Sequence, residues 1–175
     1  KKALDTGCAG IVAPQINSAA QAQQVVEWSL YPPRGRRSVG VSRAHRYGMS
    51  FGTYVEDSHK STVIVLQIEH IEGVENIDEI LGVKGVDLLF IGPYDLSGSM
   101  GRPGQVDHPD VVHAVDTVKK RCDEAGMPAG IFTADADRAA ACQQQGYTMI
   151  ACSMDTFFLW QEACRTLKEA RKHIQ

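Results

Sequence analysis

The chain of 175 residues lacks the patterns that mark several common classes of protein. No uninterrupted apolar run approaches the roughly 20 residues that a membrane-spanning helix needs, so we expect no membrane partner. The net charge of −3 provides no basic excess, so we expect no nucleic-acid partner either. Neither a G-x-G-x-x-G sequence nor a P-loop is present, which disfavours a phosphate-binding doubly wound domain.

The cysteines are few, odd in number and widely scattered. They are never arranged as Cys-x-x-Cys, which argues against a zinc ribbon and against a disulfide framework. The chain also begins without the pattern of a signal peptide, because Lys1 and Lys2 precede only a short mixed stretch. We therefore predict free thiols and a cytoplasmic protein.

Short apolar segments alternate with segments of helical periodicity along the chain, which predicts βα units and a parallel sheet. The expected strands are 10–14, 63–69, 88–92, 129–132 and 149–153, with a further short one near 38–41. The expected helices are 19–29, 73–81, 109–125, 136–145 and 155–173, and residues 1–6 resemble the end of another helix.

Five strands fit two architectures. A closed (β/α) barrel needs eight βα units and typically about 250 residues. The chain is therefore either an open doubly wound sheet or the later part of a barrel whose first strands are absent. The strand pattern alone leaves both possibilities open.

Polar side chains follow two successive apolar strands. Gln67 and Glu69 end the first, and Tyr94 and Asp95 follow Gly92-Pro93 at the end of the second. An unpaired charge at the rim of an apolar core is costly, so two such carboxylates predict a divalent metal between them. The alternative is that Glu69 pairs with an arginine and Asp95 caps a turn.

The histidines and arginines give weaker signals. His70 alternates to the face opposite Glu69, and the other five histidines are expected on the solvated surface: His45, His59, His108, His113 and His173. The basic stretch 34–46 has no interleaved aromatic residue apart from the adjoining Tyr47, which disfavours nucleic-acid binding. For Arg37 and Arg43 we favour loop anchoring or a subunit contact over binding of an anionic substrate.

The segments ALDTG, GIVAP, YPPRGRRSVG, RAHRYG, LQIE, FIGPYDLS and HPDV occur in this order. Together they resemble the HpcH/HpaI aldolase family of metal-dependent aldolases that act on pyruvate and oxaloacetate, a family that includes macrophomate synthase. The family fold is a (β/α)8 TIM barrel. The resemblance implies that this chain carries strands four to eight and their helices, with residues 1–175 as the C-terminal part of one lyase domain.

The resemblance also implies a role for each candidate residue. Glu69 and Asp95 match the two carboxylates that hold the divalent metal, Mg²⁺ in the first instance and Mn²⁺ or Co²⁺ otherwise. Gln67 matches the residue that contacts the substrate keto group, and the backbone at Tyr94 and Asp95 matches the site of the substrate carboxylate. Asp5 matches an aspartate that raises the basicity of the catalytic histidine. That histidine, and an arginine that stabilises the enolate, have no match in this chain.

The implied function is a carbon–carbon lyase that acts on pyruvate- or oxaloacetate-derived 2-oxo acids through a metal-stabilised enolate. One alternative couples oxaloacetate decarboxylation to bond formation with a pyrone, and another is a non-catalytic barrel remnant or oligomerisation module. The family also implies a homo-oligomer, a trimer or hexamer. The apolar cluster 157–160 provides either a subunit contact or ordinary core packing.

Overall fold

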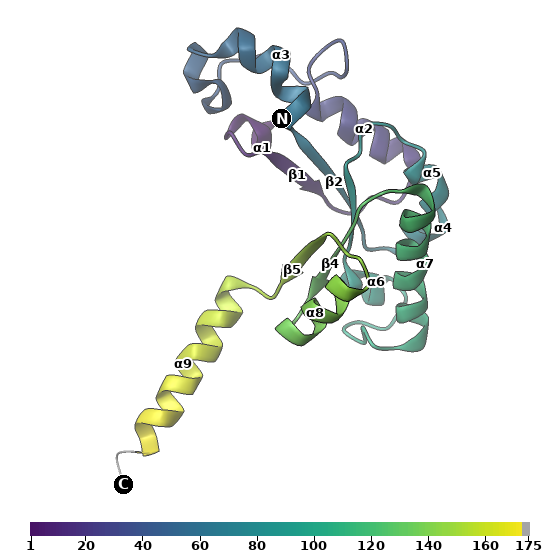
Figure 1. The fold of residues 1–175 in the computed structure, drawn as a ribbon, viewed down its shortest axis with the longest axis vertical. Helices are drawn as coiled ribbons and strands as arrows, with labels where there is room; N and C mark the ends of the chain where they lie inside the picture. Colours follow the sequence, from purple (N-terminus) through teal and green to yellow (C-terminus); the bar gives the residue numbers. More distant parts are fainter. Residues whose placement is uncertain (173–175) are drawn as a thin grey trace.

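The computed structural model describes residues 1–172, which form one curled parallel sheet with helices along one face (Figure 1). The strands are β1 (Gly10–Ala13), β2 (Val63–Ile68), β3 (Leu88–Ile91), β4 (Ala129–Thr133) and β5 (Met149–Cys152). The helices are α1 (Lys2–Asp5), α2 (Ala19–Ser29), the 3-10 helix η1 (Arg43–Gly48), α3 (Phe51–Ser61), α4 (Ile71–Glu75), α5 (Ile77–Leu81), α6 (Pro93–Ser99), α7 (Pro109–Ala125), α8 (Ala136–Gln144) and α9 (Asp155–Lys172).

The strands pair in the order β1-β2-β3-β4-β5, and every pair is parallel. All five predicted strands are confirmed, each within one residue of its expected ends. Because the strands are parallel and joined by helices, their carboxyl ends lie at one edge of the sheet. We call this the carboxyl edge, and the opposite one the amino edge.

The two faces of the sheet are packed differently. The outer face carries the larger apolar core, in which Leu66, Leu89 and Ile91 are buried against the helices. The inner face carries a smaller cluster around Val65 and Phe90, which includes partly buried residues of β4 and β5. Alternate residues of one strand therefore serve two environments, and residues that follow Val65 at intervals of two continue along the inner face.

Helices α2 and α7 have the bounds predicted from the sequence, 19–29 and 109–125. Ser18 caps α2 by accepting a hydrogen bond from the Gln21 N–H. Pro109 begins α7, and Gly126 ends it in the left-handed conformation with φ 66°. Such a φ is sterically available to glycine at little cost, which explains why this helix stops there.

Two predictions of local structure are wrong, and helix α3 was not predicted. Residues 38–41 are not a strand, and Val41 there is 73% exposed, without the burial that would favour pairing. The predicted helix 73–81 is instead α4 and α5, which are separated at Asn76, whose side chain donates to the Asn17 carbonyl oxygen. Helix α3 was not expected, because its sequence has weak helical propensity and only Ser58 is buried.

The five cysteines are free, as predicted. They range from the buried Cys122 to the exposed Cys8 and Cys164. Burial raises the pKa of Cys122 to about 11, so this thiol stays protonated at neutral pH and behaves as a small apolar core residue.

Helix α9 extends away from the sheet, and its whole described length is exposed (Figure 1). Of the two alternatives for residues 157–160, packing in the core of this chain is therefore wrong, because Leu159 is 73% exposed and Trp160 is 60% exposed. His173, the last residue of the predicted helix, lies outside the described residues. No helix within residues 1–172 has the length and hydropathy of a membrane span.

Candidate active site

Gln67 and Glu69 meet on the inner face at the carboxyl edge of β2. The Gln67 Nε2 donates a hydrogen bond to the Glu69 Oε2, as expected for side chains two residues apart on a strand, which lie on the same face. Glu69 is only 4% exposed, so its carboxylate is largely removed from water. A buried carboxylate requires several favourable contacts to remain charged.

The loop after β1 supplies a second partner for Glu69. The backbone N–H of Gln15 donates to the Glu69 Oε1 at 3.0 Å. Gln15 has a φ of 56°, a left-handed conformation that costs a non-glycine residue about 1 kcal/mol. This strain aims the N–H group at the carboxylate. No signal in the sequence predicted this conformation, because glutamine does not mark a left-handed residue.

Gly92 leaves the space that the Glu69 carboxylate occupies. A Cβ atom on Gly92 would lie 2.8 Å from the Glu69 Oε2 and 2.9 Å from the Gln67 Nε2. At these distances a Cβ atom would force the Gln67 and Glu69 side chains to shift. The approach follows from the pairing of Ile68 with Ile91, which places the carboxyl ends of β2 and β3 side by side.

Asp95 lies in the first turn of α6, close to Glu69. Burial raises the pKa of Glu69, the Gln15 N–H opposes this shift, and the negative charge of Asp95 raises the pKa further. Glu69 forms no ion pair with an arginine or lysine within residues 1–172, so that alternative is not supported for the part of the chain described. Two neighbouring carboxylates without a cationic partner are a suitable environment for a hard divalent cation.

The donor set suits an ion that keeps part of its water shell. Residues 1–172 contain no cluster of three or more His, Cys, Asp or Glu side chains able to hold a metal. Mg²⁺ is commonly held by one or two carboxylates, with water and substrate oxygens completing the octahedron. Glu69 and Asp95, with the cradle at Gly92, fit such an ion.

A hollow of about 470 Å³ opens beside these groups on the inner face. Its lining includes the predicted residues Gln67, Tyr94 and Asp95. The Tyr94 side chain is 45% exposed, and its ring meets the Phe132 ring edge to face with centroids 5.8 Å apart. The structure thus brings four predicted site residues to one place, since Glu69 contacts Gln67 directly.

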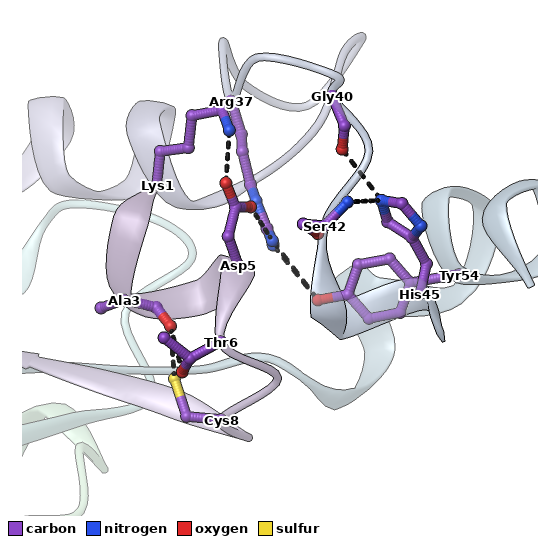
Figure 2. Close-up of polar contacts among 10 residues, drawn as sticks. All are labelled: Lys1, Ala3, Asp5, Thr6, Cys8, Arg37, Gly40, Ser42, His45 and Tyr54. Carbon is purple, nitrogen blue, oxygen red and sulfur yellow. Dashed lines mark hydrogen bonds and ion pairs between the residues drawn. The ribbon is translucent and has the colours of Figure 1, made fainter. Parts of the chain in front are cut away.

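Asp5 lies elsewhere, at the amino edge, because α1 precedes β1 (Figure 2). Its carboxylate accepts a hydrogen bond from the Arg37 Nη2 at 3.0 Å and forms an ion pair with Lys1. The Arg37 side chain is fully buried and also donates to the Tyr54 hydroxyl. Arg37 therefore anchors its loop, as predicted, and Asp5 is not near Glu69 within one chain.

His45 is buried, so the prediction that it is solvated is wrong. Its Nδ1 accepts a hydrogen bond from the Gly48 N–H at 3.1 Å, and its ring packs edge to face on Phe51. Its Nε2 lies 2.9 Å from both the Ser42 nitrogen and the Gly40 carbonyl oxygen (Figure 2). The chain folds around the imidazole because Arg46 and Tyr47 adopt φ values of 53° and 55°. Such tight turns at non-glycine residues are not apparent from sequence.

We expect Asp5→Asn to lower the free energy of unfolding by about 2 kcal/mol at neutral pH. The buried Arg37 would lose its carboxylate partner, and the loss is below that of a fully buried pair because Asp5 is partly exposed. Urea unfolding of the full-length protein measures it, with Asp57→Asn in the exposed pair with Lys60 as the control. An unchanged urea midpoint for Asp5→Asn would contradict the anchoring role.

The stabilisation that Asp5 provides is also expected to depend on pH. Burial alone would raise the pKa of Asp5, but the hydrogen bonds and charges of Lys1 and Arg37 outweigh it and lower the pKa. A lowered pKa in the folded state stabilises the fold above the ordinary aspartate range, and this stabilisation is lost as the pH falls through the lowered pKa. The difference between the wild type and Asp5→Asn should therefore shrink in acid.

The parallel α/β sheet and the paired carboxylates at its carboxyl edge define an α/β protein with a candidate cation site. The chain matches the family model described as HpcH/HpaI aldolase/citrate lyase over residues 1–161. It therefore belongs to the HpcH/HpaI aldolase/citrate lyase family, which confirms the resemblance inferred from its motifs.

Curated relatives carry the name 2-keto-3-deoxy-L-rhamnonate aldolase. The protein from Escherichia coli K12 is 39% identical over 158 residues, which are 89% of this chain and 59% of the relative. The protein from Salmonella paratyphi B is 37% identical over an alignment of 177 positions that covers 100% of this chain and 66% of the relative. The chain thus spans 59% to 66% of the length of these relatives.

Solved structures share the fold. A family member from Burkholderia cenocepacia J2315 matches with a TM-score of 0.92 and 32% identity, covering 97% of this chain and 68% of that chain. Macrophomate synthase matches with a TM-score of 0.82 and 29% identity, covering 98% of this chain and 61% of that chain.

Proposed function

We propose that the protein is a metal-dependent carbon–carbon lyase that acts on 2-oxo acids derived from pyruvate or oxaloacetate. The observation that carries the proposal is the arrangement of Gln67, Glu69 and Asp95 around the glycine cradle at Gly92. Membership of a family in which relatives of this chain carry the name 2-keto-3-deoxy-L-rhamnonate aldolase supports it. A divalent cation, Mg²⁺ first and Mn²⁺ or Co²⁺ otherwise, would supply positive charge opposite the enolate.

The proposal gives the protein groups distinct roles. Gln67 has a second amide N–H besides the one it donates to Glu69, and this second donor suits the substrate keto oxygen. Tyr94 and Asp95 lie in the first turn of α6, where the first helical hydrogen bond is the one that the Leu96 N–H donates to the Gly92 carbonyl oxygen. The N–H groups of Tyr94 and Asp95 therefore have no acceptor within the helix and suit the substrate carboxylate. Together these groups orient the 2-oxo acid before reaction.

A base must also remove a proton from the 2-oxo acid. No histidine lines the hollow among the residues that the structure describes. The base is therefore expected in a part of the full-length protein that lies outside these residues. Asp5 lies at the amino edge beside Arg37, whereas the candidate site lies at the carboxyl edge. Asp5 could therefore raise the basicity of that base only in the active site of a second copy of the chain.

The architecture proposed for the full protein is a (β/α)8 barrel, with the present strands as four to eight and residues 1–175 within one domain. The similarity to solved structures, of which this chain covers 61% to 68%, supports it. The similarity to macrophomate synthase favours a second candidate function, in which oxaloacetate decarboxylation is coupled to bond formation with a pyrone.

A homo-oligomer, trimer or hexamer, is part of the proposal, and α9 provides its contact. We expect Trp160→Glu to shift the oligomer toward smaller species, because Trp160 is exposed and stacks on Phe157 along an otherwise unpartnered helix. Light scattering coupled to gel filtration measures the mass. Gln161→Glu adds the same charge one residue away and serves as the control. An unchanged mass for Trp160→Glu would exclude this surface.

Oxaloacetate consumption by the full-length protein tests the function. With Mg²⁺ present we expect turnover, and with EDTA we expect its loss, restored by Mg²⁺ or Mn²⁺. Turnover that is indifferent to EDTA would contradict a metal-dependent mechanism. Absence of turnover in a folded, Mg²⁺-loaded protein would favour the non-catalytic alternative.

A further inference from the structure

Two hydrogen bonds connect the short segment around Glu69 to the segment that contains α6. The backbone N–H of Gly92, just before α6, donates to the Ile68 carbonyl oxygen at 3.0 Å. The backbone N–H of Ile71 donates to the Oγ of Ser99, the last residue of α6, at 3.0 Å. Glu69 lies between Ile68 and Ile71 in the chain, so its backbone is attached to the α6 segment on both sides.

The Ser99 hydroxyl uses its donor and its acceptor on two different helices. It donates to the Leu96 carbonyl oxygen of α6 at 2.7 Å and accepts from the Ile71 N–H. Ile71 is the first residue of α4, where a backbone N–H has no acceptor within the helix. The hydroxyl therefore satisfies this N–H group and joins the start of α4 to the end of α6.

The same two hydrogen bonds enclose Asp95. Gly92 precedes Asp95 and Ser99 follows it, and residues four apart in a helix lie on one face, so Asp95 and Ser99 share a face of α6. Each of the two carboxylates thus belongs to a segment that is attached to the other at both ends. One attachment is a backbone hydrogen bond, and the other depends on the hydroxyl of Ser99.

We propose that Ser99 is a positioning residue of the cation site, whose hydroxyl sets the placement of Glu69 relative to Asp95 and thereby the affinity for a divalent cation. The inference rests on the proposed function, because it requires that these carboxylates hold the cation. Removal of a group that orients metal ligands typically lowers metal affinity by about 10- to 100-fold. Mg²⁺ requires near-ideal octahedral geometry, so a small displacement of either carboxylate weakens its binding.

Titration of the full-length protein with Mn²⁺ in the presence of pyruvate tests the proposal, with the electron paramagnetic resonance of free Mn²⁺ as the readout. We expect Ser99→Ala to raise the Kd for Mn²⁺ by about tenfold. Ser99→Thr keeps the hydroxyl and should keep the wild-type Kd. Ser61→Ala is the matched control, because Ser61 also ends a helix, α3, and its hydroxyl donates to the carbonyl oxygen of Ser58, likewise three residues earlier.

A second variant removes the same hydrogen bond from the other side. Ile71→Pro deletes the N–H, and proline is favoured at the first position of a helix. His70 already has the extended backbone, φ −136° and ψ 145°, that a following proline requires. Ile71→Ala keeps the N–H and serves as the control for the lost side chain. We expect the Kd for Mn²⁺ to be about tenfold higher in Ile71→Pro than in Ile71→Ala, with no further increase when Ser99→Ala is added.

The outcomes separate this inference from the proposed function. Binding of Mn²⁺ that is lost in Glu69→Gln supports the carboxylate site itself. If binding depends on Glu69 but Ser99→Ala has the Kd of Ser61→Ala, the inference is overturned and the proposed function stands. The same holds if Ser99→Ala lowers only the urea midpoint, or if Ser99→Thr binds as weakly as Ser99→Ala. A folded wild type that does not bind Mn²⁺ would overturn both.

Discussion

Glu69→Gln is expected to reduce Mg²⁺-dependent oxaloacetate consumption by about 10³-fold, which corresponds to about 4 kcal/mol of lost transition-state stabilisation. The substitution preserves size but removes the charge of a carboxylate that is almost fully buried. A neutral amide binds a hard cation weakly, and Asp95 alone would leave the proposed ion with a single carboxylate. Steady-state kinetics at saturating Mg²⁺, with the variant's fold verified by circular dichroism, measures the loss.

Glu72→Gln is the matched control for this variant. Glu72 lies three residues along the chain, and its side chain is exposed and forms no ion pair among the described residues. The same change of charge there should alter turnover less than twofold. A folded Glu69→Gln protein with activity near that of Glu72→Gln would exclude Glu69 from the chemistry.

Gly92→Ala is expected to reduce turnover by about 10²-fold and to lower the free energy of unfolding by about 1–3 kcal/mol. The new methyl group would lie 2.8 Å from the Glu69 Oε2 and 2.9 Å from the Gln67 Nε2. Both side chains are held by hydrogen bonds, because they bond to each other and Glu69 also accepts from the Gln15 N–H. The collision must therefore displace the groups proposed to hold the cation and the keto oxygen.

Gly98→Ala separates this local collision from a general effect of replacing glycine. Gly98 lies in α6, the helix that follows Gly92, and a Cβ atom at Gly98 would meet nothing within 4 Å. Alanine should stabilise the helix slightly and leave turnover unchanged. Parallel urea unfolding and kinetics of the two variants make the comparison. Wild-type kinetics for Gly92→Ala would show that the carboxylate and the amide do not need their observed positions.

Much of the framework was predictable because it depends on local patterns. Apolar, β-rich segments located all five strands, and the period of two along β2 placed Gln67 and Glu69 on one face. Proline and glycine at its two ends bounded α7. The family motifs added the proposed roles of Glu69 and Asp95, which the strand pattern alone left open.

The features that sequence did not predict depend on contacts between distant segments. Gln15 reaches Glu69 only because β1 and β2 pair, and its left-handed backbone has no signature in the residue type. Gly92 was expected at the end of a strand, and its proximity to Glu69 emerges only when β3 pairs with β2. His45 is buried by a turn of unusual backbone conformation.

The outcome for Asp5 illustrates the same limit. Its motif implied a role beside a catalytic histidine, yet residue order alone does not say at which edge of a sheet a side chain lies. The structure places Asp5 at the amino edge, against the buried Arg37. Its role at a catalytic base stays a prediction, whereas its ion pair with Arg37 is a direct structural finding.

The central claim is that Glu69 and Asp95 hold a divalent cation that promotes enolisation of a 2-oxo acid. The most direct measurement is the exchange of the pyruvate methyl protons for deuterium in D₂O, followed by proton NMR with the full-length protein. We predict exchange that requires Mg²⁺, stops on addition of EDTA and is lost in Glu69→Gln. Exchange at the same rate in the presence of EDTA, or in Glu69→Gln, would contradict the claim.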